Sequence, residues 1–335
     1  MKPLFAAALL AASTGIAAAP GGNAGIVYTA DENAASVSMI ELASGKVTTS
    51  KVPIAPHNVQ VSRDGRTVLA VGMSAAAHGK EHGATPNGLL VILDSRDLAK
   101  QSAPIAVGQH PAHVVADSDG KYAYVTDAIA NAVKVVDLAQ KKAVGEIKTG
   151  AYPHGLRMSP DGREIYTANV RDGSMSVLDV AARREVARIP VGKAPVQVGF
   201  TPDGRRVYAS VRDENSVAVI DTAKRARIAT VKVGSKPIQV YATPDGKYVY
   251  VANQGTDRKP ANTVSVIDTA RNAVVATITV GRGAHGVVVS DDGSRVFVSN
   301  IVDNTVSMIE TATQRVASTF KVGAGPNGIS YRPAN

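Results

Sequence analysis

The chain has 335 residues, 44% of them hydrophobic, no cysteine and a formal net charge of +9. The missing cysteine excludes disulfides, thiolate catalysis and cysteine metal ligands, while the length is sufficient for a core that folds without disulfides. Surface charge serves solubility, but an excess of basic residues on one face would also suit docking to an anionic partner.

Residues 1–19 have the features of a secretory signal peptide. Lys2 provides the positive start, residues 4–12 form a short apolar stretch, and Ala17, Ala18 and Ala19 resemble a cleavage region. The stretch is too short for a membrane span with stop-transfer flanks. We therefore expect a periplasmic or secreted chain that does not span the membrane, with residues 20–335 forming a single domain.

A unit of about 42 residues recurs along the chain, which is the first feature to seek in an unknown sequence. The copies align on seven positions: His57, Ala112, His154, Val196, Ile238, His285 and Asn327. Two of the gaps are longer, and we interpret them as insertions at residues 74–87 and 255–261. The regular period indicates a closed repeat architecture.

Each repeat contains four short β-rich segments separated by turn residues. In one copy these are residues 155–159, 164–168, 175–179 and 185–191. Four strands in a unit of roughly 40 residues are typical of a β-propeller blade. We predict an all-β, seven-bladed β-propeller with four antiparallel strands per blade.

The two ends of the chain predict how the ring closes. The last repeat has room for one strand, residues 328–332, while residues 25–29, 36–41 and 46–52 supply three more. One blade is therefore expected to combine N- and C-terminal strands. Because Trp is absent and aromatic residues are scarce, we expect Val, Ile and Ala to pack the blades.

Several segments resemble the signature of YVTN-repeat β-propellers. They are Tyr250-Val251-Ala252-Asn253, Tyr124-Val125-Thr126-Asp127, Tyr166-Thr167-Ala168-Asn169 and Phe297-Val298-Ser299-Asn300. The resemblance implies a propeller related to periplasmic and surface-layer proteins, some of which bind nucleic acid. It also extends to electron-transfer subunits of quinoprotein dehydrogenases, haem d1-type propellers and streptogramin lyases, and the fold alone does not choose among them.

The histidines are the sharpest functional signal. His57, His154 and His285 occupy the same blade position, before the innermost strand, with gaps of two, three and two blades around the ring. The turns between the first and second strands and between the third and fourth strands of the blades carry many basic residues, such as Arg205 and Lys224. The blade positions of the histidines predict that they lie on the face opposite these basic turns. Three imidazoles on the channel axis would suit zinc, copper or nickel, so we predict a metal site there. The alternative is that each caps backbone groups at a blade junction.

Strand alternation predicts further residues that line the channel. Asn58, His113, Gln197 and Gln239 form the first level, and Arg157 and Tyr241 belong to the next. We expect these side chains to contact a small polar ligand or a metal complex at the channel mouth.

Four functions are compatible with these features. The favoured one is an exported binding or metal-handling protein, without catalysis, that uses the histidine-bearing face. A metal-assisted lyase or hydrolase at the same mouth is the second. The third is single-stranded nucleic-acid binding through the basic turns, and the fourth is contact with an exported protein such as a redox partner. We expect a monomer.

Overall fold

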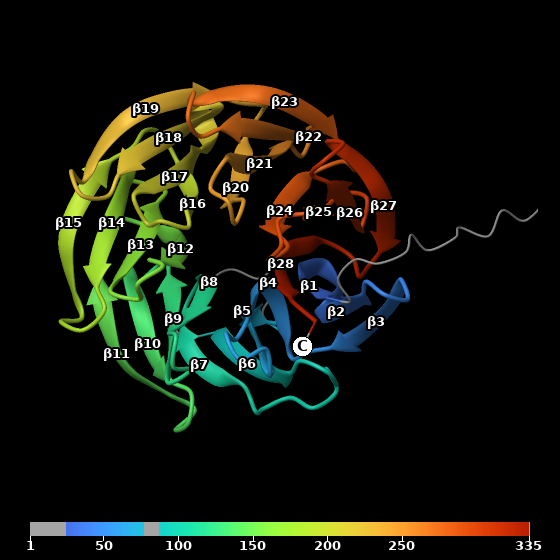
Figure 1. Ribbon diagram of the computed structural model, residues 1–335. Helices are drawn as coiled ribbons and strands as arrows, with labels where there is room; N and C mark the ends of the chain where they lie inside the picture. The colour runs from blue at the N-terminus through green and yellow to red at the C-terminus, as the bar shows by residue number, and fades with distance from the viewer. Residues whose placement is uncertain (1–24, 77–86, 335) are drawn as a thin grey trace, which may run out of the picture.

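A ring of seven β-sheets surrounds a central channel in the computed structural model, which describes residues 25–76 and 87–334 (Figure 1). Every sheet in these residues has four antiparallel strands, and successive strands of a sheet run from the channel outward. This confirms the predicted seven-bladed β-propeller. The predicted signal peptide, residues 1–19, lies outside the described residues.

The strands occupy four concentric positions. The innermost strands are β4 (Ile54–Val61), β8 (Pro111–Ala116), β12 (Pro153–Met158), β16 (Pro195–Phe200), β20 (Pro237–Ala242), β24 (Ala284–Val289) and β28 (Pro326–Arg332). The second strands are β5 (Thr67–Ser74), β9 (Tyr122–Asp127), β13 (Glu164–Asn169), β17 (Arg206–Val211), β21 (Tyr248–Thr256), β25 (Arg295–Asn300) and β1 (Ile26–Asp31).

The outer half of each blade is equally regular. The third strands are β6 (Gly88–Asp94), β10 (Ala132–Asp137), β14 (Ser174–Asp179), β18 (Ser216–Asp221), β22 (Lys259–Asp268), β26 (Thr305–Glu310) and β2 (Ser36–Glu41). The outermost strands are β7 (Ile105–Gly108), β11 (Lys142–Lys148), β15 (Arg184–Pro190), β19 (Ala226–Lys232), β23 (Ala273–Thr279), β27 (Arg315–Lys321) and β3 (Lys46–Lys51). Two single-turn 3-10 helices are η1 (Glu32–Ala34) and η2 (Arg212–Glu214).

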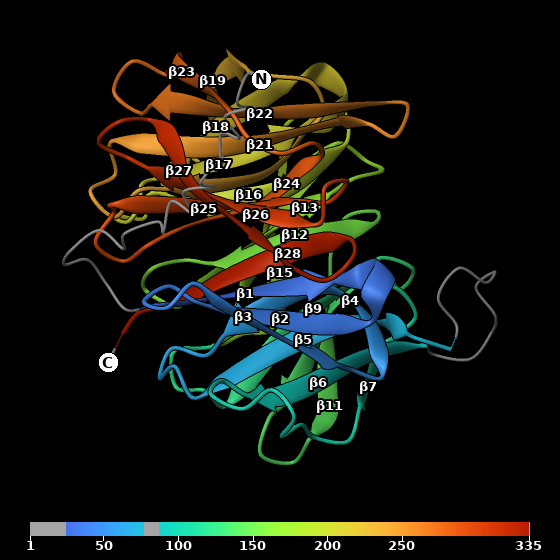
Figure 2. The same ribbon diagram turned by 90° about the vertical axis from the view of Figure 1, so that its right-hand side faces the viewer.

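One sheet joins the two ends of the described chain, as predicted. Its strand order is β28-β1-β2-β3, and β28 pairs antiparallel with β1. Both ribbon views show the red C-terminal strand beside the blue N-terminal one (Figures 1 and 2). Closing the ring in this way leaves no blade without neighbours, so the sheets bury both faces.

The predicted insertion at residues 255–261 extends a hairpin. Strands β21 and β22 continue to pair at Gly255 with Pro260 and at Thr256 with Lys259. The insertion at 74–87 falls mostly outside the described residues. Elsewhere the innermost strands begin up to two residues earlier than predicted, because the Pro that precedes most of them already has extended geometry.

Aromatic side chains contribute more to the core than the composition suggested. The second strands bury an aromatic ring in six blades, each at most 1% exposed: Tyr28, Tyr124, Tyr166, Tyr208, Tyr250 and Phe297. Such a ring removes roughly 150–250 Å² from water. Val, Ile and Ala make up most of the buried core, as expected, and these rings add to it. The rings join clusters that bridge adjacent sheets, as Tyr166 does with Val198 and Val207.

The Asn that ends three of the signature segments is a buried structural residue. Asn169 donates from its side-chain nitrogen to the hydroxyls of Ser174 and Ser176, and Asn253 and Asn300 make equivalent bonds. Each amide thus links the second strand of its blade to the third where both enter the loop. Buried polar groups are tolerated when bonded in this way.

Candidate functional site

A local irregularity aims the histidines at the channel. The pairing between first and second strands shifts register between Pro56 and Asn58, between Pro111 and Val114, between Pro153 and Leu156, and between Ala284 and Val287. The four histidines of the innermost strands, His57, His113, His154 and His285, lie within these shifts. A β-bulge redirects a side chain that regular alternation would turn elsewhere. The same irregularity therefore brings imidazoles from distant repeats to one end of the channel.

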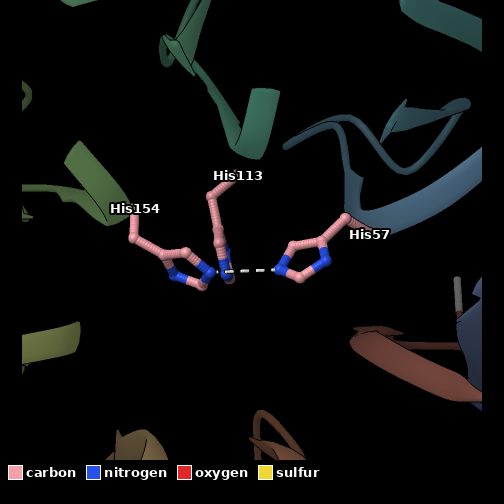
Figure 3. Close-up of side chains that lie close together, drawn as sticks. All are labelled: His57, His113 and His154. Carbon is pink, nitrogen blue, oxygen red and sulfur yellow. Dashed lines mark hydrogen bonds between the residues drawn. The ribbon is translucent and has the colours of Figure 1, made fainter. Parts of the chain in front are cut away.

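Three imidazoles converge, and the set differs from the predicted one. His57, His113 and His154 each offer a ring nitrogen, and these nitrogens all lie within 4.8 Å of one another (Figure 3). The Nε2 atoms of His57 and His154 are 3.2 Å apart. His285 lies beside this group, with its ring centroid 6.4 Å from that of His57. The predicted metal site contains His57, His154 and His285, and His113 is predicted to line the ligand site. In the structure His113 takes the place of His285 in the group of three.

Backbone carbonyls hold two of the rings. The Nδ1 of His154 lies 3.2 Å from the Val196 carbonyl oxygen, and the Nδ1 of His285 lies 3.1 Å from that of Asn327. A carbonyl only accepts, so each Nδ1 carries the proton and each Nε2 keeps its lone pair. In His154 this Nε2 lone pair accepts a hydrogen bond from Nε2 of His57 at 3.2 Å. The proton of His57 therefore lies on Nε2 and has to move to Nδ1 when a metal ion binds.

His57 is held by residues from the two ends of the chain. Its Nδ1 lies 3.0 Å from the side-chain nitrogen of Asn327 and 3.4 Å from Oε2 of Glu32. The Asn327 amide also donates to Glu32 at 2.6 Å. A carboxylate behind an imidazole orients the ring and increases its basicity when it donates to that carboxylate.

Gln197 fixes the third imidazole. Its Oε1 accepts a hydrogen bond from the Val198 backbone at 2.8 Å, so its Nε2 faces Nδ1 of His113 at 3.1 Å. An amide nitrogen donates, so His113 Nδ1 accepts here and its proton lies on Nε2. The amide fits because position 155 is Gly, where a Cβ would lie 2.3 Å from Gln197 Oε1.

Burial keeps these imidazoles neutral. It lowers the pKa of His113 and of His154 well below the ordinary value, and the neighbouring histidines lower both further. Burial, followed by the proximity of His57, lowers the pKa of His285 to about 4. At neutral pH the rings of His113, His154 and His285 are therefore uncharged, and a neutral imidazole is the form that binds metals.

The geometry of His57 and His154 fits a tetrahedral metal ion. With Zn–N bonds of about 2.0–2.1 Å, two tetrahedral ligands lie roughly 3.3 Å apart. The observed Nε2–Nε2 separation is 3.2 Å. The third nitrogen has to move inward to complete the same geometry. Among the described residues this is the one group of three metal-ligating side chains at such distances.

The predicted amide lining is present, but it bonds to the protein. Asn58, Gln197 and Gln239 are at most 2% exposed. Asn58 Oδ1 accepts from the Val114 backbone at 3.4 Å, and Gln239 Oε1 accepts from Val287 at 3.3 Å. These bonds connect innermost strands of adjacent blades, so the amides hold the channel wall together.

Arg157 and Tyr241 lie at the opposite end of the channel from the histidine group. Both line a cavity of about 590 Å³ where the innermost strands end. The predicted ligand-lining residues are therefore divided: His113 lies with the other histidines, the amides between, and Arg157 and Tyr241 beyond them. Alternation places all of them in the channel, but it does not give their depth.

Sequence reasoning missed Glu32. This residue begins the 3-10 helix η1, in the blade that joins the two ends of the chain. Its partner Asn327 occupies the repeat position of His154. The repeat alignment and the predicted closure could have indicated this contact. Together they bring the turn after the first strand, which contains Glu32, beside the start of the last strand, which contains Asn327.

The fold places the chain in the class of seven-bladed β-propellers. Comparison with known proteins then assigns the family. The sequence model described as YNCE-like beta-propeller matches residues 92–333. The chain belongs to the YNCE-like β-propeller family. No match to a curated protein was found.

Solved structures show the same architecture. A chain of Kuenenia stuttgartiensis hydrazine synthase is 23% identical, with a TM-score of 0.71 over 85% of this chain and 94% of that one. A putative 6-phosphogluconolactonase from Bacteroides uniformis is 14% identical, with a TM-score of 0.75 over 92% and 100%. At these identities the likeness concerns the fold alone. In the described part of the chain, no helix is long and apolar enough to cross a bilayer.

Proposed function

We propose that this protein is an exported metal-binding propeller that holds a divalent transition metal ion between His57, His113 and His154. The observation that carries the proposal is the convergence of three imidazoles from three separate blades, with one pair already at the spacing of tetrahedral ligands. Imidazole nitrogen suits zinc, copper and nickel. Water or a small polar ligand would complete the coordination.

The surroundings support a site that exists before the metal arrives. The Val196 carbonyl fixes the proton of His154, and Glu32 lies behind His57. Burial lowers the pKa of His113 and of His154, so neither ring carries a positive charge that would repel the metal ion. Two imidazoles that are already at ligand spacing reduce the ordering cost of binding, although His113 still has to move inward.

Calorimetric titration of the purified chain, without an affinity tag, with Zn(II), Cu(II) and Ni(II) tests the proposal. We expect one tight site, and we expect His154→Ala to weaken it more than the roughly 10–100-fold that loss of an outer-shell partner costs. His285→Ala is the matched control, since it removes a buried imidazole beside the group and should change the affinity less than threefold. Circular dichroism checks that both variants fold.

Equal affinities of wild type and His154→Ala for all three metals would exclude the site. A loss with His285→Ala but none with His113→Ala would instead support the set predicted from the repeat alignment.

Export is a separate part of the proposal and rests on residues 1–19. Fractionation of cells that express the full chain, followed by N-terminal sequencing of the mature protein, tests it. We expect a periplasmic or secreted product that has lost these residues. A cytoplasmic product that retains them would contradict export while leaving the metal site untouched.

A further inference from the structure

The cavity at the end of the channel opposite the histidines has the size of a ligand site. Its volume is about 590 Å³, within the range of about 300–1,000 Å³ of small-molecule pockets. It lies where the innermost strands end, so its floor is formed by side chains that point into the channel. The metal site proposed above does not use it.

A cation that has no counter-ion among the described residues lies in the floor of this cavity. Arg157 makes one hydrogen bond within the described residues, from Nη1 to its neighbour's carbonyl on Leu156 at 3.2 Å. No described carboxylate lies within 4.0 Å of its guanidinium nitrogens. The face of Tyr241 lies 6.0 Å away. Desolvation by burial lowers the pKa of Arg157, so the surroundings favour an anion beside it.

The acids around the cavity are already engaged in turns. Asp117 accepts from the backbone of Lys121 and Tyr122, and Asp161 accepts from Ser159 and the backbone of Arg163. Asp291, which accepts from the Tyr331 hydroxyl at 3.4 Å, and the exposed Arg63 also line the cavity. The three acids therefore outnumber the two cations around the opening. This arrangement admits a single negative charge and disfavours a multiply charged anion.

The walls of the cavity add apolar surface. Val115, Met158, Phe200, Val288 and Ile329 line it together with Tyr241. A guanidinium presents five donors in a planar fork that matches a carboxylate with two parallel hydrogen bonds. One cation at the base of an apolar pocket is the arrangement that holds a carboxylate with a hydrophobic body.

We propose that this cavity binds a small organic monocarboxylate, with the carboxylate on Arg157 and the apolar part of the ligand against Phe200, Met158 and Tyr241. The site uses none of the proposed metal ligands and lies at the other end of the same channel.

Fluorine NMR of the full chain in the presence of EDTA tests the proposal with 4-fluorobenzoate as the probe. We expect 4-fluorobenzoate to bind the wild type at least tenfold more tightly than the neutral 4-fluorobenzamide, since a hydrogen-bonded charge contributes about 10–100-fold to affinity. We expect Arg157→Gln to bind 4-fluorobenzoate more weakly than the wild type by the same factor. Arg163→Gln is the matched control, because it removes the same charge from an exposed side chain in the same hairpin and should change the affinity less than twofold.

The comparison of the two probes on the wild type needs no variant, so the test holds even if Arg157→Gln fails to fold. Equal binding of 4-fluorobenzoate and 4-fluorobenzamide, unchanged binding by folded Arg157→Gln, or no binding of 4-fluorobenzoate would each overturn the proposal. Tight binding of inorganic phosphate that displaces the probe would also overturn it, because the site would then prefer a multiply charged inorganic anion. EDTA keeps the result independent of the metal-binding proposal.

Discussion

At the scale of single residues, Gln197 controls how His113 can bind a metal ion. Its amide donates to His113 Nδ1 and leaves the ring proton on Nε2, the atom that a metal would need. His154 has the opposite and favourable arrangement, with a carbonyl that accepts from Nδ1. The three imidazoles are therefore not equivalent, and an acceptor at position 197 would make His113 resemble His154.

This leads to a prediction for Gln197→Glu. One carboxylate oxygen can still accept from Val198, while the other accepts from His113 Nδ1–H and frees Nε2 for the metal. We expect zinc affinity to rise about 10–100-fold, the range that outer-shell partners control, as measured by competition with a chromophoric chelator.

Gln239→Glu is the control for this substitution. Gln239 is the corresponding amide of the next blade, but its Oε1 bonds to the Val287 backbone and not to a histidine. We expect it to leave zinc affinity unchanged. Weaker zinc binding by Gln197→Glu than by the wild type would show that His113 does not bind through Nε2.

Glu32 is expected to act through His57. Its carboxylate lies 3.4 Å from Nδ1 and would accept the Nδ1 proton once Nε2 holds the metal. Glu32→Gln should therefore weaken zinc binding about 10–100-fold while the fold is retained. Glu214→Gln, in the other 3-10 helix, is the matched control, because Glu214 accepts from the Lys193 backbone instead. Titration of both variants should separate them, and equal affinities would contradict the role of Glu32.

At the scale of elements, the joined blade replaces a buried amide with a buried acid. Asp31 ends β1 at the position that Asn169, Asn253 and Asn300 occupy in the second strands of other blades. Its carboxylate accepts from Thr29, Ser36 and Ser38. Burial raises the pKa of Asp31 to about 6 despite these bonds. The folded state therefore prefers the protonated acid.

The raised pKa predicts the effect of Asp31→Asn on stability. Below the unfolded-state pKa of about 4 the acid is protonated in both the folded and the unfolded state, so its ionisation does not lower the free energy of unfolding. Between pH 4 and about 6 the unfolded chain releases this proton while the folded chain retains it, so the wild type loses stability over that range and stays at the lower value above it. Asp31→Asn should thus be more stable than the wild type at pH 8, by up to about 3 kcal/mol, and the difference should vanish near pH 4.

Urea unfolding at pH 4 and pH 8 measures this difference. Asp127→Asn is the control, since the carboxylate of Asp127 lies 4.0 Å from Lys134 and accepts from three backbone N–H groups. We expect Asp127→Asn to be no more stable than the wild type at pH 8. A wild type more stable than Asp31→Asn at pH 8 would contradict the account of Asp31.

Elements and site differ in how far the sequence predicts them. The strands were predictable to within about two residues, because Pro, Gly and Asp mark the turns of a regular repeat. The convergence of His113 with His57 and His154 was not predictable in this way. Bulges at the start of the innermost strands turn side chains away from the directions that simple alternation assigns. The contact between Glu32 and Asn327 spans almost the whole chain, so it becomes visible only when the ring is closed.

At the scale of the whole molecule, the proposed metal would join three consecutive blades. His57, His113 and His154 belong to β4, β8 and β12, and Asn327 of β28 supports the first of them. A ligand that binds only the closed ring stabilises it by mass action, about 2.7 kcal/mol at a concentration 100 times Kd. Calorimetric unfolding should show Tm rising with zinc in the wild type and in His285→Ala, but not in His154→Ala. A Tm that rises equally in all three would point to zinc binding elsewhere.

The most direct test of the metal site is anomalous diffraction from crystals of the zinc-loaded protein, measured on both sides of the zinc edge. The three-imidazole account predicts one strong peak about 2.0–2.1 Å from nitrogens of His57, His113 and His154, with His285 outside the coordination sphere. A peak ligated by His285 in place of His113, or no peak at the histidine end of the channel, would contradict it.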